Sequence, residues 1–377
     1  MTTKEDGRRS LLTSIRLDGY KSIGSGELAQ TIRLSDATIM IGANGSGKSN
    51  LVSFFSLLNH MMTGSLQRHV AENGTAENFL HFGSKHTPEF SARLTFGNGT
   101  GEDAYSFTLK KSVQDTLFFS EECVSKNGVL SEAQPGNKES FLTDGEALGE
   151  GKPAVSQILS ACKVFQFHDT SASSYIRNTA SLDNDRSLMG NGGNLAAYLY
   201  MLKTTEKYSR YYRRIAERIR FMMPQFGDFV LEPQARNNNY IRLRWTAKDE
   251  PDYIFGPEQL SDGSIRFMAL ATLLLQPPEL LPKVVVLDEP ELGLHPRAVD
   301  MLAHLIKTAA QNCQIVVATQ SPRMLDSFTA EDIIVAEYNG ASRSSTYTRL
   351  NPDELSDWLE RFSLSELWEK NVLGGQP

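Results

Sequence analysis

The segment that most constrains the fold of this chain is a glycine-rich loop, Gly-Ala-Asn-Gly-Ser-Gly-Lys-Ser, at positions 42–49. Its two framing glycines lie five residues apart, and Lys48 and Ser49 follow directly. Glycines let the backbone pass close to a phosphate group, so that its N–H groups point at the phosphate oxygens. An apolar run at residues 38–41 precedes the loop, and a longer one at 51–62 follows it. This pattern predicts a strand, a phosphate-binding loop and a helix, in that order.

The loop therefore predicts a site for the phosphates of ATP. Lys48 is placed to bridge the terminal phosphates, which makes it a catalytic candidate, and the Ser49 hydroxyl is placed to ligate Mg²⁺. The helix that begins here adds the positive end of its dipole. We assign nucleotide contacts to the whole loop and the residue after it: Gly42, Ala43, Asn44, Gly45, Ser46, Gly47, Lys48, Ser49 and Asn50.

A second segment that carries chemistry is an apolar run at residues 284–287, which ends in Asp288 and Glu289. Acids at the carboxyl end of a buried strand lie where α/β sheets bind their ligands. Asp288 is placed to hold Mg²⁺ through water, and Glu289 is placed to polarise an attacking water molecule. Acids often end strands, but together with the glycine-rich loop this pair predicts hydrolysis of ATP.

Two further segments identify a family. The sequence Leu-Ser-Asp-Gly-Ser at 260–264 resembles the signature sequence of ABC-type ATPases, whose usual form is Leu-Ser-Gly-Gly-Gln. The sequence EPELGLHP at 289–296 resembles the D-loop of RecF-like and OLD-like ATPases. As a set, the motifs within 11–64 and 260–335 resemble the ABC-type ATPases of the SMC/RecF/OLD-like class. The resemblance implies an α/β P-loop ATPase head with inserted β-rich and short helical lobes, and ATP and Mg²⁺ as cofactors.

The resemblance also implies roles for residues outside these motifs. Ser261 and Gly263 would contact the γ-phosphate of an ATP held by a second copy, because heads of this class clamp two nucleotides between two subunits. Gln166 would be a metal-sensing Q-loop glutamine, unless it is a strand glutamine with no such role. Gln320 stands where most of these ATPases carry a catalytic histidine, and a glutamine donates a hydrogen bond but carries no proton. We therefore predict slow turnover and a long-lived ATP-bound state.

At 377 residues the chain is long enough for several lobes, and periodicity places its elements. Strands are predicted at 12–17, 38–41, 91–96, 105–109, 164–168, 284–287 and 315–318. Helices are predicted at 51–62 and 194–223, one or two amphipathic helices at 352–370, and a loop at 131–152. We expect five segments: 1–64 (first part of the head), 65–163 (β-rich insert), 164–250 (Q-loop strand and helical lobe), 251–340 (second part of the head) and 341–377 (C-terminal strand and helices).

Composition narrows the cellular role. The net charge of −7 argues against a surface that binds nucleic acid throughout. The three cysteines are far apart, which fits a reducing cytoplasm and neither a disulfide framework nor a zinc site. The longest apolar run, at 268–275, is too short to span a membrane. We expect a cytoplasmic homodimer or higher homo-oligomer, joined through ATP-sandwiched heads, with no membrane contact.

Three hypotheses remain for what the ATPase controls. The favoured one is a switch or scaffold for a separate effector protein in bacterial (anti-phage) defence, because no nuclease block follows the ATPase motifs. The second is a RecF-like DNA-binding ATPase in DNA repair, based on five arginines and three tyrosines at 208–220, although a solvated helix face is the favoured explanation of these residues. The third is a non-hydrolysing, ATP-dependent structural scaffold, which Gln320 leaves open.

Overall fold

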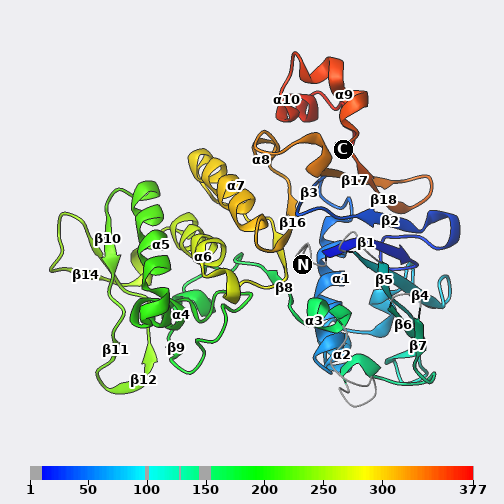
Figure 1. Ribbon diagram of the computed structural model, residues 1–377, viewed down its shortest axis with the longest axis horizontal. Coiled ribbons are helices and arrows are strands. Elements are labelled where there is room, and N and C mark those ends of the chain that lie inside the picture. The colour runs from blue at the N-terminus through cyan, green and yellow to red at the C-terminus, as the bar shows by residue number, and fades with distance from the viewer. Residues whose placement is uncertain (1–10, 98–101, 127–128, 144–153, 377) are drawn as a thin grey trace, which may run out of the picture. The chain divides into compact units, whose positions relative to one another are not determined.

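A computed structural model describes residues 11–97, 102–126, 129–143 and 154–376 of the chain (Figure 1). The chain divides into two compact units. We call the first the P-loop unit, comprising Met1–Lys163, Ala330–Phe362 and Glu366–Pro377, and the second the signature unit, comprising Val164–Thr329 and Ser363–Ser365. Both contain helices and strands, so the predicted α/β class is confirmed; the finer division into five segments stays a prediction.

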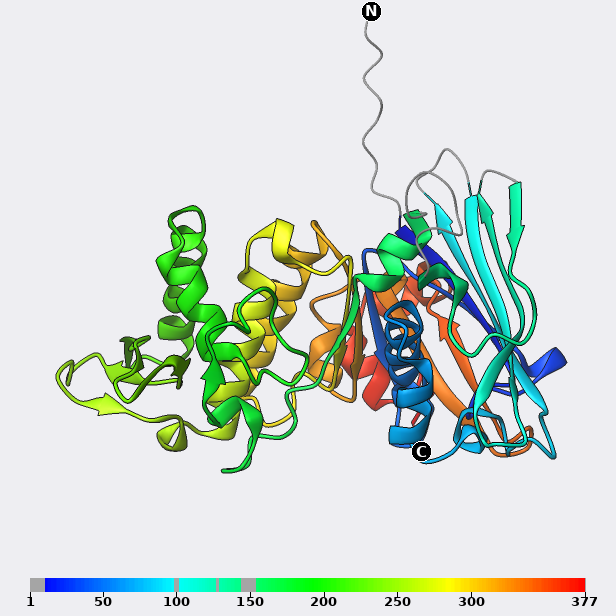
Figure 2. The ribbon, with the colours of Figure 1, turned by 90° about the horizontal axis from the view of Figure 1, so that it is seen from below.

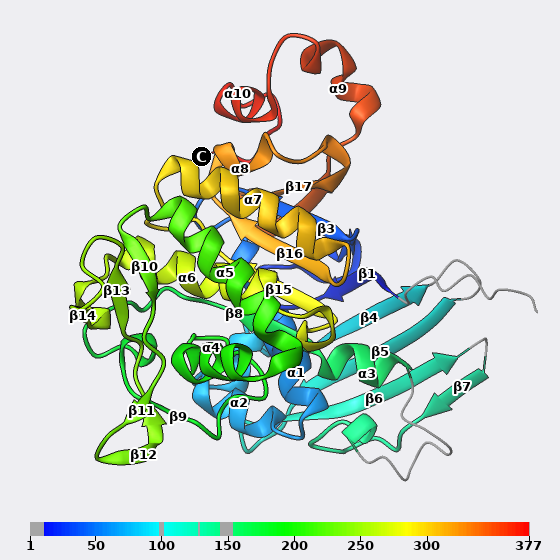
Figure 3. The ribbon, with the colours of Figure 1, turned by 60° about the vertical axis from the view of Figure 1, so that its left-hand side comes forward.

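An antiparallel sheet forms one side of the P-loop unit. Its strands are β1 (Leu11–Asp18), β2 (Gln30–Arg33), β4 (Glu89–Gly97), β5 (Glu102–Lys111), β6 (Leu117–Lys126) and β7 (Val129–Glu132), in the spatial order β2-β1-β4-β5-β6-β7. Figure 3 shows β4 to β7 side by side. Alternate residues such as Phe90, Leu94 and Phe107 are buried, as expected for a sheet with one covered face. The strands predicted at 91–96 and 105–109 are confirmed.

The glycine-rich loop lies between β3 (Ala37–Ile41) and α1 (Lys48–Met62). Every residue of β3 is buried, and the strand pairs in parallel with β17 (Ile333–Asn339), which pairs antiparallel with β18 (Ser344–Arg349). Figure 2 shows α1 beside the antiparallel sheet, and the Phe54 ring of α1 stacks on Phe107 of β5 with centroids 6.4 Å apart. The remaining helices that lie wholly in this unit are α2 (Leu66–Glu72), α3 (Ala154–Ser160) and α9 (Pro352–Leu359).

The signature unit contains β15 (Val284–Asp288) and β16 (Gln314–Thr319), which are parallel and fully buried. The strands predicted at 284–287 and 315–318 are confirmed. The apolar helix α6 contacts α5 on one side and α7 on the other (Figure 1). The helices of this unit are α4 (Leu195–Thr204), α5 (Ser209–Met222), α6 (Asp262–Leu275), α7 (Pro296–Ala310) and α8 (Pro322–Leu325).

Two small three-stranded sheets complete the signature unit, in the orders β10-β13-β14 and β11-β12-β9. Their strands are β9 (Ala180–Ser181), β10 (Phe226–Phe229), β11 (Pro233–Gln234), β12 (Asn237–Ile241), β13 (Trp245–Ala247) and β14 (Ile254–Phe255). Two elements lie across the division of the chain, β8 (Cys162–Phe165) and α10 (Leu364–Glu369). No helix among the described residues is long and apolar enough to cross a membrane.

Three local predictions need correction. The strand predicted at 164–168 ends at Phe165, because Gln166 and His168 turn their side chains to Asp288 instead of continuing a ladder. The helix predicted at 194–223 is two helices, since Thr205 takes an extended conformation between them. Of the loop predicted at 131–152, the first two residues belong to β7, and residues 144–152 lie outside the described residues.

Candidate nucleotide site

The glycine-rich loop has a shape that side chains would prevent. Gly45 and Gly47 have φ angles of 79° and 108°, which glycine adopts readily. A Cβ atom on Gly42 would lie 2.3 Å from the Ala336 carbonyl oxygen of β17, and one on Gly47 would lie 2.4 Å from the Ser345 hydroxyl of β18. Strands β17 and β18, which are far along the chain, therefore pack closely against the loop. Residues larger than glycine do not fit at Gly42 and Gly47.

The lysine of the loop is held at the start of α1. Lys48 is buried, and its ammonium group donates to the carbonyl oxygens of Gly42 at 2.7 Å and Ala43 at 2.9 Å. The Ser46 hydroxyl is buried without a hydrogen-bond partner among the described residues. Ser49, in the first turn of the helix, is exposed. Lys48 and the helix N-terminus supply donors that fit the oxygens of a nucleotide phosphate chain, and the Ser49 hydroxyl oxygen fits as a ligand of its Mg²⁺ ion.

The signature unit holds the acid pair at the carboxyl end of β15. Asp288 is buried, and its Oδ2 accepts a hydrogen bond from Gln166 Nε2 at 2.8 Å. The Asp288 carbonyl oxygen lies 2.8 Å from His168 Nε2, so that nitrogen carries the proton and donates. The structure thus brings Gln166 to the predicted metal-binding carboxylate, as a Q-loop role requires.

Gln320 connects the second acid of the pair to a third. Its side-chain amide donates to Glu289 Oε1, and its backbone N–H donates to Glu291 Oε1 at 3.0 Å. The Thr319 hydroxyl donates to the same Glu291 oxygen at 2.6 Å. Glu289 itself has a φ of +40°, a strained conformation of the kind found at functional sites. Gln320 is therefore held at its backbone and at its side chain, next to the predicted catalytic carboxylate.

Glu291 was not predicted from the sequence. Burial raises the pKa of its carboxyl group, and the nearby Glu289 carboxylate adds to this effect. Its Oε2 atom is buried without a hydrogen-bond partner among the described residues. The sequence signal that could have pointed to it is its position, an acid two residues after Glu289.

The signature loop caps helix α6. The Ser261 hydroxyl accepts a hydrogen bond from the Ser264 N–H at 3.1 Å, which makes Ser261 the N-cap. A Cβ on Gly263 would lie 2.4 Å from the Gly293 carbonyl oxygen, so glycine is needed where the signature and the D-loop touch. Asp262, which replaces a glycine of the usual motif, accepts from buried Arg177 at 2.8 Å. The aspartate that replaces the usual glycine at position 262 is therefore held by Arg177.

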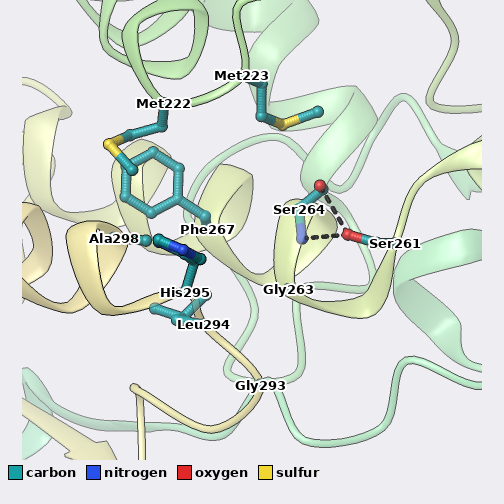
Figure 4. A pocket seen from close by; sticks show the side chains of 10 residues that line it. All are labelled: Met222, Met223, Ser261, Gly263, Ser264, Phe267, Gly293, Leu294, His295 and Ala298. Carbon is teal, nitrogen blue, oxygen red and sulfur yellow. Dashed lines mark hydrogen bonds between the residues drawn. The ribbon is translucent and has the colours of Figure 1, made fainter.

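A hollow of about 170 Å³ lies beside this loop. Figure 4 shows Ser261 and Ser264 on one side of it, and Met222, Phe267 and His295 on the other. The hollow therefore has a polar edge at the N-terminus of α6 and an otherwise mostly apolar lining.

Arg266 is a second residue that the sequence did not reveal. It lies inside α6, is 4% exposed, and donates to the carbonyl oxygens of Phe167 at 2.8 Å, His168 at 3.1 Å and Leu292. One side chain of the signature helix thus ties the segment that carries Gln166 to the D-loop. The sequence signal that could have pointed to it is a lone arginine in an apolar run, because a buried charged group requires hydrogen-bond acceptors around it.

The structure therefore places the predicted residues in two groups, each within its own unit. Residues 42–50 form the loop of the P-loop unit, while the signature unit carries Asp288 with Gln166, Glu289 with Gln320, and the signature loop. A glycine-rich loop at a helix start, an acid pair ending a buried strand and a capped signature helix define the class of ABC/SMC-like P-loop ATPases.

The comparisons with known proteins agree with this class. Residues 37–326 match the family described as "AAA domain, putative AbiEii toxin, Type IV TA system", and the chain belongs to that family. No curated protein matches the chain.

Solved structures show the same fold at low sequence identity. The chain is similar to an Smc head bound to the C-winged helix domain of ScpA, with a TM-score of 0.62, 17% identity, and coverage of 92% of this chain and 99% of that one. It is also similar to an Smc head with an extended coiled coil from Pyrococcus furiosus, bound to the C-terminal domain of ScpA, with a TM-score of 0.58, 16% identity, and coverage of 93% and 99%. The SMC-head fold predicted from the motifs is confirmed.

Proposed function

We propose that this chain binds and slowly hydrolyses ATP, and that ATP joins two copies head to head as a switch for a separate effector protein. The observation that carries the proposal is the arrangement around the acid pair, in which Gln166 holds Asp288 and Gln320 holds Glu289. The two carboxylates are thereby oriented for different tasks. Asp288, with Ser49 and Gln166, would hold Mg²⁺, which neutralises charge on the phosphates.

In this proposal Glu289 orients the water that attacks the γ-phosphate in line. Lys48 stabilises the charge that develops on the transferred phosphoryl group, and the signature helix of the second copy adds to it. The exposed Ser261 at the N-terminus of α6 supports that contact, because a helix start with free N–H groups attracts an anion. Gln320 orients Glu289 without carrying a proton, which supports slow turnover.

The role of the switch rests on the family description and on the motifs. The description names a toxin of a Type IV TA system, which supports a partnership with a separate effector in bacterial defence. The ScpA-bound Smc heads show that heads of this fold accept a protein partner. We propose that the ATP-joined dimer, and not the free chain, is the form that engages the effector.

The first test combines Glu289→Gln with a second substitution. Glu289→Gln is expected to bind MgATP, to lose hydrolysis and to run as a dimer in size-exclusion chromatography with light scattering. Adding Ser261→Arg is expected to restore the monomer while ATP stays bound, because only the contact with the second copy is blocked. Lys48→Ala is the control that loses ATP itself. A Glu289→Gln chain that stays monomeric at saturating MgATP contradicts the two-head mechanism.

The second test names the partner. The tagged Glu289→Gln variant is purified from its native host with MgATP, beside Lys48→Ala as the nucleotide-free control. A stoichiometric protein that accompanies only the first variant supports the effector switch. Recovery of nuclease-sensitive DNA without a protein contradicts it and favours the RecF-like alternative.

One observation favours that alternative specifically. Helix α5 buries one face, including Ile215 and Ile219, and exposes Arg210, Arg213 and Arg214 on its surface. A basic helix face of this kind fits the phosphates of DNA. Binding of a DNA duplex that falls steeply with salt, and that is weakened by Arg213→Ala with Arg214→Ala, would support DNA as the ligand.

A further inference from the structure

A buried arginine beside the signature loop lies outside every ATPase motif of the sequence. Arg177, in the signature unit, is 6% exposed. Its guanidinium group donates to the carbonyl oxygen of Thr170 at 2.6 Å and to that of Leu260 at 3.1 Å. It also donates to the carbonyl oxygen of Pro257 and to Asp262 Oδ1, the latter at 2.8 Å. A buried charge requires such acceptors, and here they come from two segments that are far apart along the chain.

The bonds from Arg177 lie on both sides of Ser261 in the signature loop. Leu260 directly precedes Ser261, and Asp262 directly follows it. The Leu260 N–H also donates to the Pro257 carbonyl oxygen at 3.2 Å, so one guanidinium group contacts both ends of the turn that leads into the loop. Arg177 therefore fixes the backbone before and after Ser261.

The aspartate at position 262 adds a charge to this arrangement. The glycine of the usual signature sequence has no side chain to offer, whereas the Asp262 carboxylate accepts a charge-assisted hydrogen bond. Hydrogen bonds from Arg177 and Thr170 lower the pKa of the Asp262 carboxyl group, so it is ionised at neutral pH. The departure from the usual sequence thus strengthens the attachment of the loop to Arg177.

The other segment that Arg177 holds begins at the predicted metal site. Gln166 donates to Asp288 Oδ2, and His168 donates to the Asp288 carbonyl oxygen. Thr170 follows in the same segment and gives its own carbonyl oxygen to Arg177. This segment therefore contacts the predicted metal-binding residue at one end and the arginine of the signature loop at the other.

We propose that Arg177 is a positioning residue that fixes the signature loop to the segment of the metal site, so that Ser261 faces the nucleotide of a second copy in one orientation. The inference rests on the proposed function, because that function supplies the second copy. Without this arginine the loop takes several conformations, and the contact between the copies has to order it. Arg177, which lies 83 positions before Leu260, thus provides in advance the order that assembly requires.

The test measures how tightly Glu289→Gln chains join in saturating MgATP, by sedimentation over a range of protein concentrations. Adding Arg177→Met is expected to raise the dissociation constant of the dimer roughly 10- to 150-fold, the equivalent of one charge-assisted hydrogen bond. MgATP binding by the monomer, measured by isothermal titration with Ser261→Arg in every variant, is expected to stay unchanged, because the glycine-rich loop belongs to the other unit. Arg244→Met, at an arginine that pairs with exposed Glu232, is the matched control and is expected to change neither value.

A positioning role also predicts a rescue that a loss of folding does not. In the otherwise wild-type chain, Arg177→Met is expected to lower ATP hydrolysis per chain at low protein concentration and to recover it as the concentration rises. Asp262→Asn removes only the charge of a side chain that is 67% exposed, so it tests the same contact if Arg177→Met does not fold. It is expected to weaken the dimer in the same direction and to add nothing to Arg177→Met, because the two residues share one contact.

The outcomes distinguish this inference from the proposed function. If Glu289→Gln chains join in MgATP, and Arg177→Met and Asp262→Asn leave the dissociation constant unchanged, the positioning role is overturned and the two-head mechanism stands. If Arg177→Met weakens MgATP binding by the monomer as much as it weakens the dimer, its effect is not on the signature loop and the role is again overturned. If Glu289→Gln chains stay monomeric in saturating MgATP, the two-head mechanism fails and the inference fails with it.

Discussion

The substitution Arg266→Met tests whether one side chain of the signature helix fixes the two loops beside it. Methionine keeps most of the apolar stem and removes the guanidinium group. In the structure that group donates to the carbonyl oxygens of Phe167 and His168 and to that of Leu292. Since Arg266 is 4% exposed, water does not readily replace the lost donors.

The magnitude follows from three charged hydrogen bonds and one buried charge. Each bond from a charged donor contributes about 1.5–3 kcal/mol, so the three contribute about 5–9 kcal/mol. Burial lowers the pKa of Arg266, and the desolvation behind this shift offsets several kcal/mol. We expect a net loss of about 3 kcal/mol in the free energy of unfolding of the signature unit. For a unit of this size, that loss lowers its melting temperature by about 6–12 °C.

The assay is hydrogen exchange with mass spectrometry on the full chain, combined with thermal unfolding. Exchange is expected to accelerate at residues 166–171 and 290–295, while the glycine-rich loop keeps its protection. Arg213→Met, on the exposed face of α5, is the control and is expected to change stability by less than about 0.5 kcal/mol. An Arg266→Met chain with unchanged protection in both segments and an unchanged melting temperature would refute the reasoning.

Three further predictions concern single side chains. Gln320→His is expected to hydrolyse ATP faster than the wild type in a steady-state phosphate-release assay, because histidine orients Glu289 and also carries a proton. A rate no higher than that of the wild type counts against the idea that Gln320 makes turnover slow. Burial raises the pKa of Glu291 in the folded chain, so its contribution to stability is present at low pH and is lost as pH rises through that raised pKa. Glu291→Gln is therefore expected to gain melting temperature relative to wild type as pH rises above the ordinary range of a glutamate. A difference that stays constant with pH contradicts this. Tyr347→Phe removes the hydrogen bond from the tyrosine hydroxyl to the Gly47 carbonyl oxygen. It is expected to lower the free energy of unfolding by about 1 kcal/mol, measured by thermal unfolding, and to weaken tripolyphosphate binding. If stability and binding are both unchanged, this bond does not hold the loop.

The parts of the site that the sequence predicts are those in which chemistry and local structure coincide. The loop at 42–49 needs its glycines, its lysine and its serine at fixed spacing, and an apolar strand must precede it. The acid pair at Asp288 and Glu289 likewise ends a strand that is buried along its whole length. Because both patterns lie within a dozen residues, neighbouring residues alone are enough to find them.

The parts that the sequence does not predict depend on contacts between distant residues. Arg177 reaches Asp262 across 85 positions, and Arg266 reaches Phe167 across 99. Arg266 stands out locally as a lone arginine in an apolar run, but no local pattern shows which distant residues either arginine contacts. The sequence also did not predict the break at Thr205, because the apolar residues on both sides of it continue a helical period.

The position of Gln320 between two carboxylates has a consequence for how this ATPase responds to pH. A glutamine is neutral at every pH, so the bond from its side chain to Glu289 does not titrate. A histidine in its place would hold Glu289 more strongly when protonated, and its charge would change near neutral pH. Beside Gln320, burial raises the pKa of Glu291, which accepts the backbone N–H of the same glutamine. Protonation of Glu291 would weaken that bond without changing the charge of Gln320. The pH dependence of hydrolysis should therefore flatten in Glu291→Gln and persist in a variant that alters only the side chain of residue 320.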